Sequence, residues 1–248
     1  MLSRLKAIFS SSEVRQIPNG LGVPELPSNF VKGSETLSNN HLKNTINQFF
    51  LPKIKKLGYQ GKDFYFYKEN TQYTQAVFFW LHRGGGAVQV DLLVKFNSII
   101  YPSGSELAKD KPLRPENSEF QFRLSPNNKE KEFVPDNWFW LLTTTEQGLE
   151  MLVNDIWRVF EARGIPYFKQ FENHQKLLSE INPKNFTQFP DFRIQNFILR
   201  NQLEILYFLH CYWKISGNSI KANEFASALK SLLKEEPNEE FQALINGK

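Results

Sequence analysis

The chain has 248 residues, of which 41 % are hydrophobic and 15 % aromatic, and this composition excludes a disordered chain. A single cysteine, Cys211, excludes an intramolecular disulfide, and with only four histidines beside it we expect no zinc site and no other cofactor. The net charge is +4, and residues 1–125 carry 16 basic against 10 acidic side chains, so an acidic partner is permitted but not required.

Residues 1–40 form the first part of the chain. Leu2, Leu5, Ile8 and Phe9 fall on one helical face, which predicts a short amphipathic helix docked on the protein, with contact to a membrane surface as the alternative. Residues 13–40 are rich in proline and glycine and predict an irregular arm. No apolar stretch approaches the roughly 18 residues of a transmembrane helix, so we expect a cytoplasmic protein.

Residues 41–182 are expected to form an α+β domain. Apolar residues at helical spacing predict a helix that is capped by Asn39 or Asn40 and stops at Gly58. Pro52 lies inside this pattern, and we expect it to kink or divide the helix because proline has no N–H to donate.

Three strand patterns follow this helix. Asp63–Lys68 is short and aromatic, and Tyr73–Arg83 and Ala87–Phe96 flank the glycines at 84–86, which predicts a β-hairpin. The second hairpin strand alternates, so one of its faces should pack on helices. The side chains on that face are Val88, Val90, Leu92, Val94 and Phe96.

The rest of the domain alternates less clearly. Phe120–Leu124 predicts a strand, and Trp138–Leu142 predicts a short strand or a buried segment. A helix should begin at Thr144 or Thr145 and end at Gly164 and Pro166, and a shorter helix is expected over Asn173–Ile181.

Residues 183–248 predict a helical extension packed on this domain. Its helices are expected over Ile194–Ile215 and Ala222–Leu233, and the acidic residues on both sides of Pro237 predict a polar tail. Strands followed by helices favour an α+β fold, in which an antiparallel β-sheet is covered by helices and carries a C-terminal helical extension.

Three segments together carry a family resemblance. They are LPKIKKLGYQGKDFYFY (51–67), the hairpin QAVFFWLHRGGGAVQVDLLVKF (75–96) and the helix TTEQGLEMLVNDIWRVFEARGIPYFKQF (144–171). Over residues 41–180 this pattern resembles the bacterial family called domain of unknown function 4304. The resemblance implies a compact bacterial α+β domain without an established reaction, and it transfers no catalytic residue.

The glycines of the hairpin are the first candidate for a functional site. No Lys-Ser/Thr follows them and the next element is a strand, so they predict a hairpin tip rather than a phosphate-binding loop. We expect a non-enzymatic module that binds another protein, for example an accessory or immunity-type factor of a bacterial conflict system. Exposed aromatic residues and arginine are the usual anchors of such an interface. The residues proposed for it are His82, Arg83, Gly84, Gly85 and Gly86, with Trp138 and Trp140 if these are exposed.

Nucleic-acid binding is the first alternative. Lys53, Lys55, Lys56 and Lys62 lie close in sequence to the aromatic residues 64–67, and lysines beside aromatic rings can bind a single strand by charge and stacking. No recognised RNA-binding motif accompanies them.

An enzyme whose site is assembled from scattered residues is the second alternative, with Asp91 and His82 as candidates. Asp91 and Lys95 share a strand face, as in some metal-dependent nucleases, but Leu93 stands where the second carboxylate would be. An outward-facing Asp–Lys pair on the sheet is the simpler interpretation. The histidines at 41, 82, 174 and 210 show no metal-ligand spacing.

Overall fold

A computed structural model gives the fold of the chain. It describes residues 38–81, 86–101, 113–126, 140–183, 193–194, 197–198, 202–235 and 237–245. The chain divides into two compact units, Met1–Phe30 and Val31–Lys248, and all described residues belong to the second unit. The predicted N-terminal helix and most of the arm therefore lie outside the described residues.

Eight described strands form one sheet. They are β1 (Gln60–Lys62), β2 (Tyr65–Glu69), β3 (Tyr73–Leu81), β4 (Ala87–Phe96), β5 (Phe120–Arg123), β6 (Trp140–Leu141), β7 (Arg193–Ile194) and β8 (Phe197–Ile198). Their order is β1-β2-β3-β4-β5-β8-β7, with β6 also paired to β4, and every pair is antiparallel.

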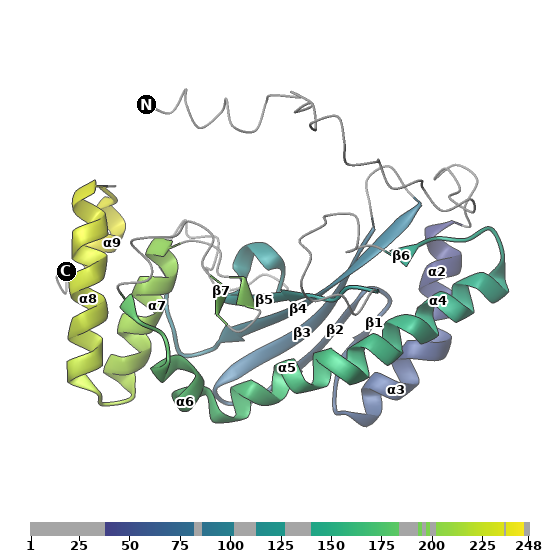
Figure 1. Cartoon of the computed structure of the whole chain (residues 1–248), viewed down its shortest axis with the longest axis horizontal. Helices are drawn as coiled ribbons and strands as arrows, with labels where there is room; N and C mark the ends of the chain where they lie inside the picture. Colours follow the sequence, from purple (N-terminus) through teal and green to yellow (C-terminus); the bar gives the residue numbers. More distant parts are fainter. Residues whose placement is uncertain are drawn as a thin grey trace, which may run out of the picture. The chain divides into compact units, whose positions relative to one another are not determined.

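The helices precede and follow the strands in sequence. The first group is α2 (Asn39–Thr45), η1 (Ile46–Phe50) and α3 (Leu51–Lys56), and the short helix η2 (Pro115–Asn117) precedes β5. The second group is α4 (Glu146–Val159), η4 (Phe160–Gly164), α5 (Ile165–Lys169), η5 (Gln170–Asn173) and α6 (His174–Ser179). The third is α7 (Gln202–Ile215), α8 (Ser219–Glu235) and α9 (Glu239–Ile245). The predicted α+β fold is thus confirmed, and α4 and α5 run across the sheet in Figure 1.

One face of the sheet packs against the helices, and aromatic rings fill this contact. The fully buried Phe50 ring of η1 lies 5.4 Å from Phe66 of β2 and 5.2 Å from Phe79 of β3, measured between ring centroids. Trp157 and Phe160 contact the same ring from the α4 side at 5.3 and 5.8 Å. Because aromatic pairs bury large areas and add edge-to-face attraction, this cluster fixes the helices on the sheet.

The C-terminal helices continue this core. The fully buried Phe208 of α7 lies 5.2 Å from Phe96 of β4 and 5.6 Å from Phe120 of β5, again between ring centroids. The helix predicted to begin at Ile194 begins only at Gln202, and residues 193–194 and 197–198 instead form β7 and β8. The reason is that the open edge of β5 offers backbone partners, and Ile198 pairs there with Gln121.

A wide helical turn precedes each of the two prolines at which the sequence predicts a disturbance of the helix. The helical backbone continues from α2 to α3, and the π-helical segment η1 ends two residues before Pro52. Likewise η4 ends two residues before Pro166, and the helix continues through Gly164 and Pro166 into α5, so the predicted end there is wrong. A π turn has i→i+5 hydrogen bonds, so the backbone at each proline is accommodated without ending the helix.

The spacing of the buried side chains explains why the wide turns lie where they do. Leu42, Ile46, Phe50 and Ile54 recur every four residues, and each is 0 % exposed. In a regular α-helix, four residues turn about 40° more than one full turn, so the last of the four would drift about 120° away from the first. The wider turn of η1 removes most of that drift and keeps all four side chains in the core.

The opposite face of the sheet carries a second, smaller cluster. Ala76, Leu93 and Leu113 are buried there, with Tyr65 and Phe78 among the half-buried rings packed around them. The Leu113 N–H donates to the Tyr65 hydroxyl at 3.1 Å, which joins the chain before η2 to β2. This face lies opposite the helices because its residues alternate with those of the aromatic core along β2, β3 and β4.

Candidate functional site

The strongest candidate surface lies at the described end of the β3–β4 hairpin, on the face opposite the helices. The strand register pairs Trp80 with Gln89, Phe78 with Asp91, and Asp91 in turn with Arg123 of β5. Leu141 of β6 pairs with Ala87 on the same face. We name Phe78, Trp80, Gln89, Arg123 and Leu141 the hairpin-end surface.

Two large hydrophobic side chains are exposed on the hairpin-end surface. Trp80 is 38 % exposed and Leu141 is 36 % exposed. The indole of Trp80 packs edge-on against Phe78, with 5.0 Å between ring centroids and 83° between ring planes. Because Phe78 itself packs on the cluster around Leu93, the exposed ring stands on a fixed support.

A buried ion pair lies beside these rings. Asp91 is 0 % exposed, and its Oδ1 accepts from the Arg123 Nε at 2.8 Å. Arg123 Nη2 lies 3.3 Å from the other carboxylate oxygen, and Gln89 Nε2 donates to that oxygen at 3.1 Å. The carboxylate is therefore satisfied by three nitrogens, and the guanidinium is held in one orientation with about a quarter of its side chain exposed.

Most of the tip residues predicted as a binding site fall outside the described residues. His82, Arg83, Gly84 and Gly85 are among these, so their assignment stays a prediction. Gly86 is described: its φ is +76°, and its carbonyl oxygen accepts from the Leu142 N–H at 2.8 Å. This residue therefore joins the hairpin to β6.

Of the two tryptophans predicted as exposed anchors, only Trp140 lies among the described residues. Trp138 lies outside the described residues. Trp140 is 5 % exposed, so it does not meet the condition of exposure and is not an anchor. Its indole faces the helices instead, where Nε1 donates to Asp155 of α4 at 2.8 Å. The neighbouring Leu141 takes the outward position because successive side chains of a strand point to opposite faces.

The four lysines of the nucleic-acid hypothesis are divided between the two sides of the sheet. Lys53 donates to Asn154 of α4 at 3.0 Å and lies 5.5 Å from the centre of the Trp157 ring. Lys55 and Lys56 are exposed on α3. Lys62 pairs with Tyr65 and so belongs to the face opposite the helices. The register therefore does not gather these four lysines beside the aromatic residues 64–67.

Asp91 is not half of an outward-facing pair with Lys95, as the strand pattern suggested. Its carboxylate is fully buried against Arg123, because the register places β5 beside it. His82, the other candidate of the enzyme hypothesis, lies outside the described residues. Among the residues that the structure describes, no three His, Cys, Asp or Glu side chains converge as metal ligands.

Each of the three described histidines has a hydrogen-bond partner. His41 Nδ1 lies 2.8 Å from the Ser38 hydroxyl, and His210 Nδ1 donates to the Ala222 carbonyl at 2.9 Å. His174 Nδ1 shares a 2.6 Å hydrogen bond with the Tyr212 hydroxyl, and partial burial lowers its pKa. The first contact is local to the start of α2, the other two join α6 to α7 and α7 to α8, and the three described histidines do not converge on one site.

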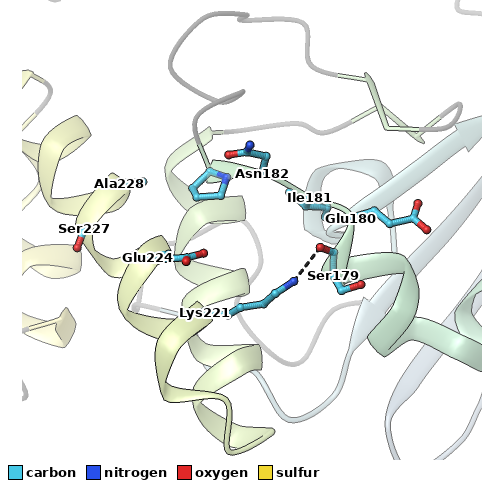
Figure 2. Close-up of a pocket in the computed structure, with 9 residues that line it drawn as sticks. Ser179, Glu180, Ile181, Asn182, Lys221, Glu224, Ser227 and Ala228 are labelled. Carbon is cyan, nitrogen blue, oxygen red and sulfur yellow. Dashed lines mark hydrogen bonds between the residues drawn. The ribbon is translucent and has the colours of Figure 1, made fainter.

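A cleft of about 790 Å³ lies between the end of α6 and helix α8. Figure 2 shows Lys221 reaching across from α8, where its Nζ donates to the Ser179 carbonyl at 2.7 Å. The same ammonium lies 4.7 Å from the centre of the Trp213 ring. Lys221 is thus occupied in joining α8 to α6, and we do not assign a ligand to this cleft.

Local sequence patterns could indicate only part of the hairpin-end surface. Alternation along Tyr73–Arg83 places Phe78 and Trp80 on one face, so their shared side was available from the sequence. Arg123 and Leu141 were missed because their positions depend on the register of β5 and β6 against β4.

Comparisons with known proteins add no relative: no family model matches the chain, and no curated protein or solved structure is similar to it. The resemblance to the domain of unknown function 4304 family therefore rests on the residue pattern and stays a prediction. No helix among the described residues is both long and apolar enough to cross a bilayer.

Proposed function

We propose that this chain binds another protein through the hairpin-end surface and catalyses no reaction, as an accessory or immunity-type factor of a bacterial conflict system would. The observation that carries the proposal is Trp80, which is 38 % exposed on the same face of the sheet as an arginine held by a buried carboxylate. Tryptophan and arginine are the residue types most enriched among those that contribute most binding energy at protein interfaces.

The geometry of the surface supports tight binding because little of it needs to be ordered on contact. Trp80 rests on Phe78, and Arg123 is held by Asp91 through two nitrogens. Side chains that are already fixed lose less conformational entropy when a partner binds. Leu141, on the other side of β4, extends the apolar area across the sheet.

The charges of this surface favour a protein over a nucleic acid. Binding to phosphates depends on unpaired positive charge and weakens steeply with salt. Here Asp91 neutralises the guanidinium of Arg123, and Lys53 is bonded to Asn154 on the helix-covered side. Among the five described residues of the hairpin-end surface, the positive charge is therefore paired with a buried carboxylate.

The proposal is tested by affinity capture from the source cells with Trp80→Glu and with Met151→Glu as a matched control. Met151 is 68 % exposed on α4, which packs on the other face of the sheet. We expect a stoichiometric protein that survives nuclease treatment, is retained by Met151→Glu and is lost with Trp80→Glu. With that protein purified, Trp80→Ala should weaken the affinity by at least about 30-fold, the effect expected of a dominant interface residue.

Two results would overturn the proposal. Retention of the captured protein by Trp80→Glu would show that another surface binds it. Recovery of nucleic acid in place of protein, with an affinity that falls steeply as salt increases, would favour the nucleic-acid alternative. Arg83→Ala, tested in the same way, decides whether the hairpin tip belongs to the surface.

A further inference from the structure

The edge of β3 that faces β2 is paired over only part of its length. Strand β2 reaches as far as Tyr65, which lies opposite Phe78. One further bond follows, in which the Phe79 N–H donates to the Phe64 carbonyl at 2.8 Å, and the chain before Phe64 turns back into β1. Strand β3 stays paired with β4 as far as Leu81. The last two residues of β3 therefore extend past the end of β2.

The register shows where the backbone groups of this extension point. The Phe79 N–H is directed toward β2, and in an antiparallel ladder residues two apart direct their backbone groups to the same side. The N–H and C=O of Leu81 therefore point away from β4, whereas those of Trp80 point toward it. The Val90 carbonyl, opposite Phe79, accepts from the Leu124 N–H at 2.9 Å, as this alternation requires. Within the described part of the chain, no hydrogen bond reaches the outward N–H and C=O of Leu81.

The exposure of Trp80 has the same origin. A side chain inside a sheet has a cross-strand neighbour on each side. Phe78 has Tyr65 of β2 on one side and Asp91 of β4 on the other. Trp80 has Gln89 of β4 on one side, but on the other side β2 has already ended. The unpaired backbone edge and the exposed indole thus belong to one unfilled strand position.

Strand β2 cannot fill this position by continuing. Asp63, in the turn before β2, has a φ of +62°, which is a left-handed conformation and not that of a strand. Its N–H donates to the Asn47 Oδ1 at 2.9 Å, and its carboxylate pairs with Lys43 at 2.9 Å. Because these contacts fix the turn on the first helices, the position beside the end of β3 remains open to a segment of another chain.

We propose that the partner protein adds an extended segment to the sheet as a strand beside Trp80 and Leu81, with an apolar side chain packed on the indole. This inference rests on the proposed function and names the part of the partner that the surface recognises. An unpaired strand edge is a template for a strand from another chain. The partner residue opposite Leu81 exchanges both backbone bonds with it, and the residue opposite Trp80 has its Cβ about 5 Å from that of Trp80.

Linear peptides provide the first test. The probe is a peptide selected from a random displayed library on the full chain, and kept only if it does not bind Trp80→Glu. Leu81→Pro removes the outward N–H and leaves the bonds to β4, since proline is tolerated where the N–H of an edge strand points outward. Leu81→Val changes the side chain but keeps the N–H. We expect Leu81→Val to bind the peptide at least about tenfold more tightly than Leu81→Pro.

Hydrogen exchange of the wild-type chain is the second test, and it does not depend on the folding of a variant. The Leu81 amide should exchange at least about tenfold more slowly when the chain is saturated with the selected peptide. The Trp80 amide serves as the internal control, because its bond to β4 is present with and without the peptide.

Three results would overturn strand addition. One is a library that yields no peptide dependent on Trp80. Another is equal affinity of Leu81→Pro and Leu81→Val, or, if Leu81→Pro does not fold, unchanged exchange of the Leu81 amide in the wild-type chain. The third is self-association of the wild-type chain that Leu81→Pro abolishes, which would assign the edge to a second copy.

The captured protein separates this inference from the proposed function. If Trp80→Glu loses that protein while Leu81→Pro and Leu81→Val retain it equally, the hairpin-end surface still binds a protein and strand addition is wrong. If Trp80→Glu retains it, both proposals are wrong.

Discussion

On the helix-covered face of the sheet the fully buried side chains are phenylalanines such as Phe50 and Phe66, whereas on the opposite face a fully buried position is occupied by Asp91. The first face is closed by packing, and the second combines a small apolar cluster, an ion pair and the partly exposed Trp80. Strands β3 and β4 supply both faces, because their side chains alternate. The same two strands can therefore stabilise the fold on one side and present a binding surface on the other.

The largest effect should come from Phe50 on the helix-covered face. Phe50→Ala removes a ring that contacts four others, so we expect the free energy of unfolding to fall by about 3–5 kcal/mol. Urea denaturation measures this loss. A cost below about 1 kcal/mol would mean that this face is less tightly packed than the ring contacts indicate.

Removing Arg123 and removing Asp91 from the ion pair of the opposite face should lower the free energy of unfolding by different amounts. Arg123→Met leaves the carboxylate of Asp91 buried without its cation, and we expect a loss of about 3 kcal/mol. Asp91→Asn should cost less, because the half-buried Arg123 can turn its guanidinium toward water. Denaturation of both variants at neutral pH gives the comparison, and equal costs would contradict it.

A side chain added at Gly164 of η4 should lower the free energy of unfolding by an intermediate amount. A Cβ at Gly164 would lie 2.4 Å from the nearest ring carbon of Phe160, which is fully buried and has no room to move away. Gly164→Ala should therefore destabilise the fold by about 1–3 kcal/mol, although alanine favours helix. Gly217→Ala serves as a control without crowding, since nothing lies within 4 Å of its added Cβ, although its φ of +77° adds backbone strain.

The smallest effect on stability should come from Trp80. Because the ring is already 38 % exposed, Trp80→Ala should change the free energy of unfolding by about 1 kcal/mol or less while weakening partner binding at least about 30-fold. Thermal unfolding and the capture experiment measure the two properties separately. A loss of stability as large as that of Phe50→Ala would mean that Trp80 belongs to the core.

Part of this architecture is readable from local patterns and part is not. The β3–β4 hairpin and its alternation follow from residues 73–96, and the helix α4 follows from its apolar spacing. The strands at 193–194 and 197–198 depend on the open edge of β5. The predicted polar tail is wrong where α9 forms, because its buried residue Phe241 finds its partner Tyr207 only in the folded chain. Local rules describe the intrinsic preference of a segment and cannot supply the partner it meets.

The candidate site follows the same division. Trp80 and Asp91 stand out in the strand pattern, but the burial of Asp91 depends on Arg123, which lies 32 residues further along the chain.

The wide turns η1 and η4 have a consequence for how this chain would compare with relatives. Each wide turn amounts to one additional residue within a helix. A relative that lacks the proline at 52 or 166 could form a regular helix with one residue fewer and still direct its apolar side chains toward the sheet. In an alignment of such chains, a single-residue gap just before either proline would then mark a helix without the wide turn. It would not mark a change in a loop.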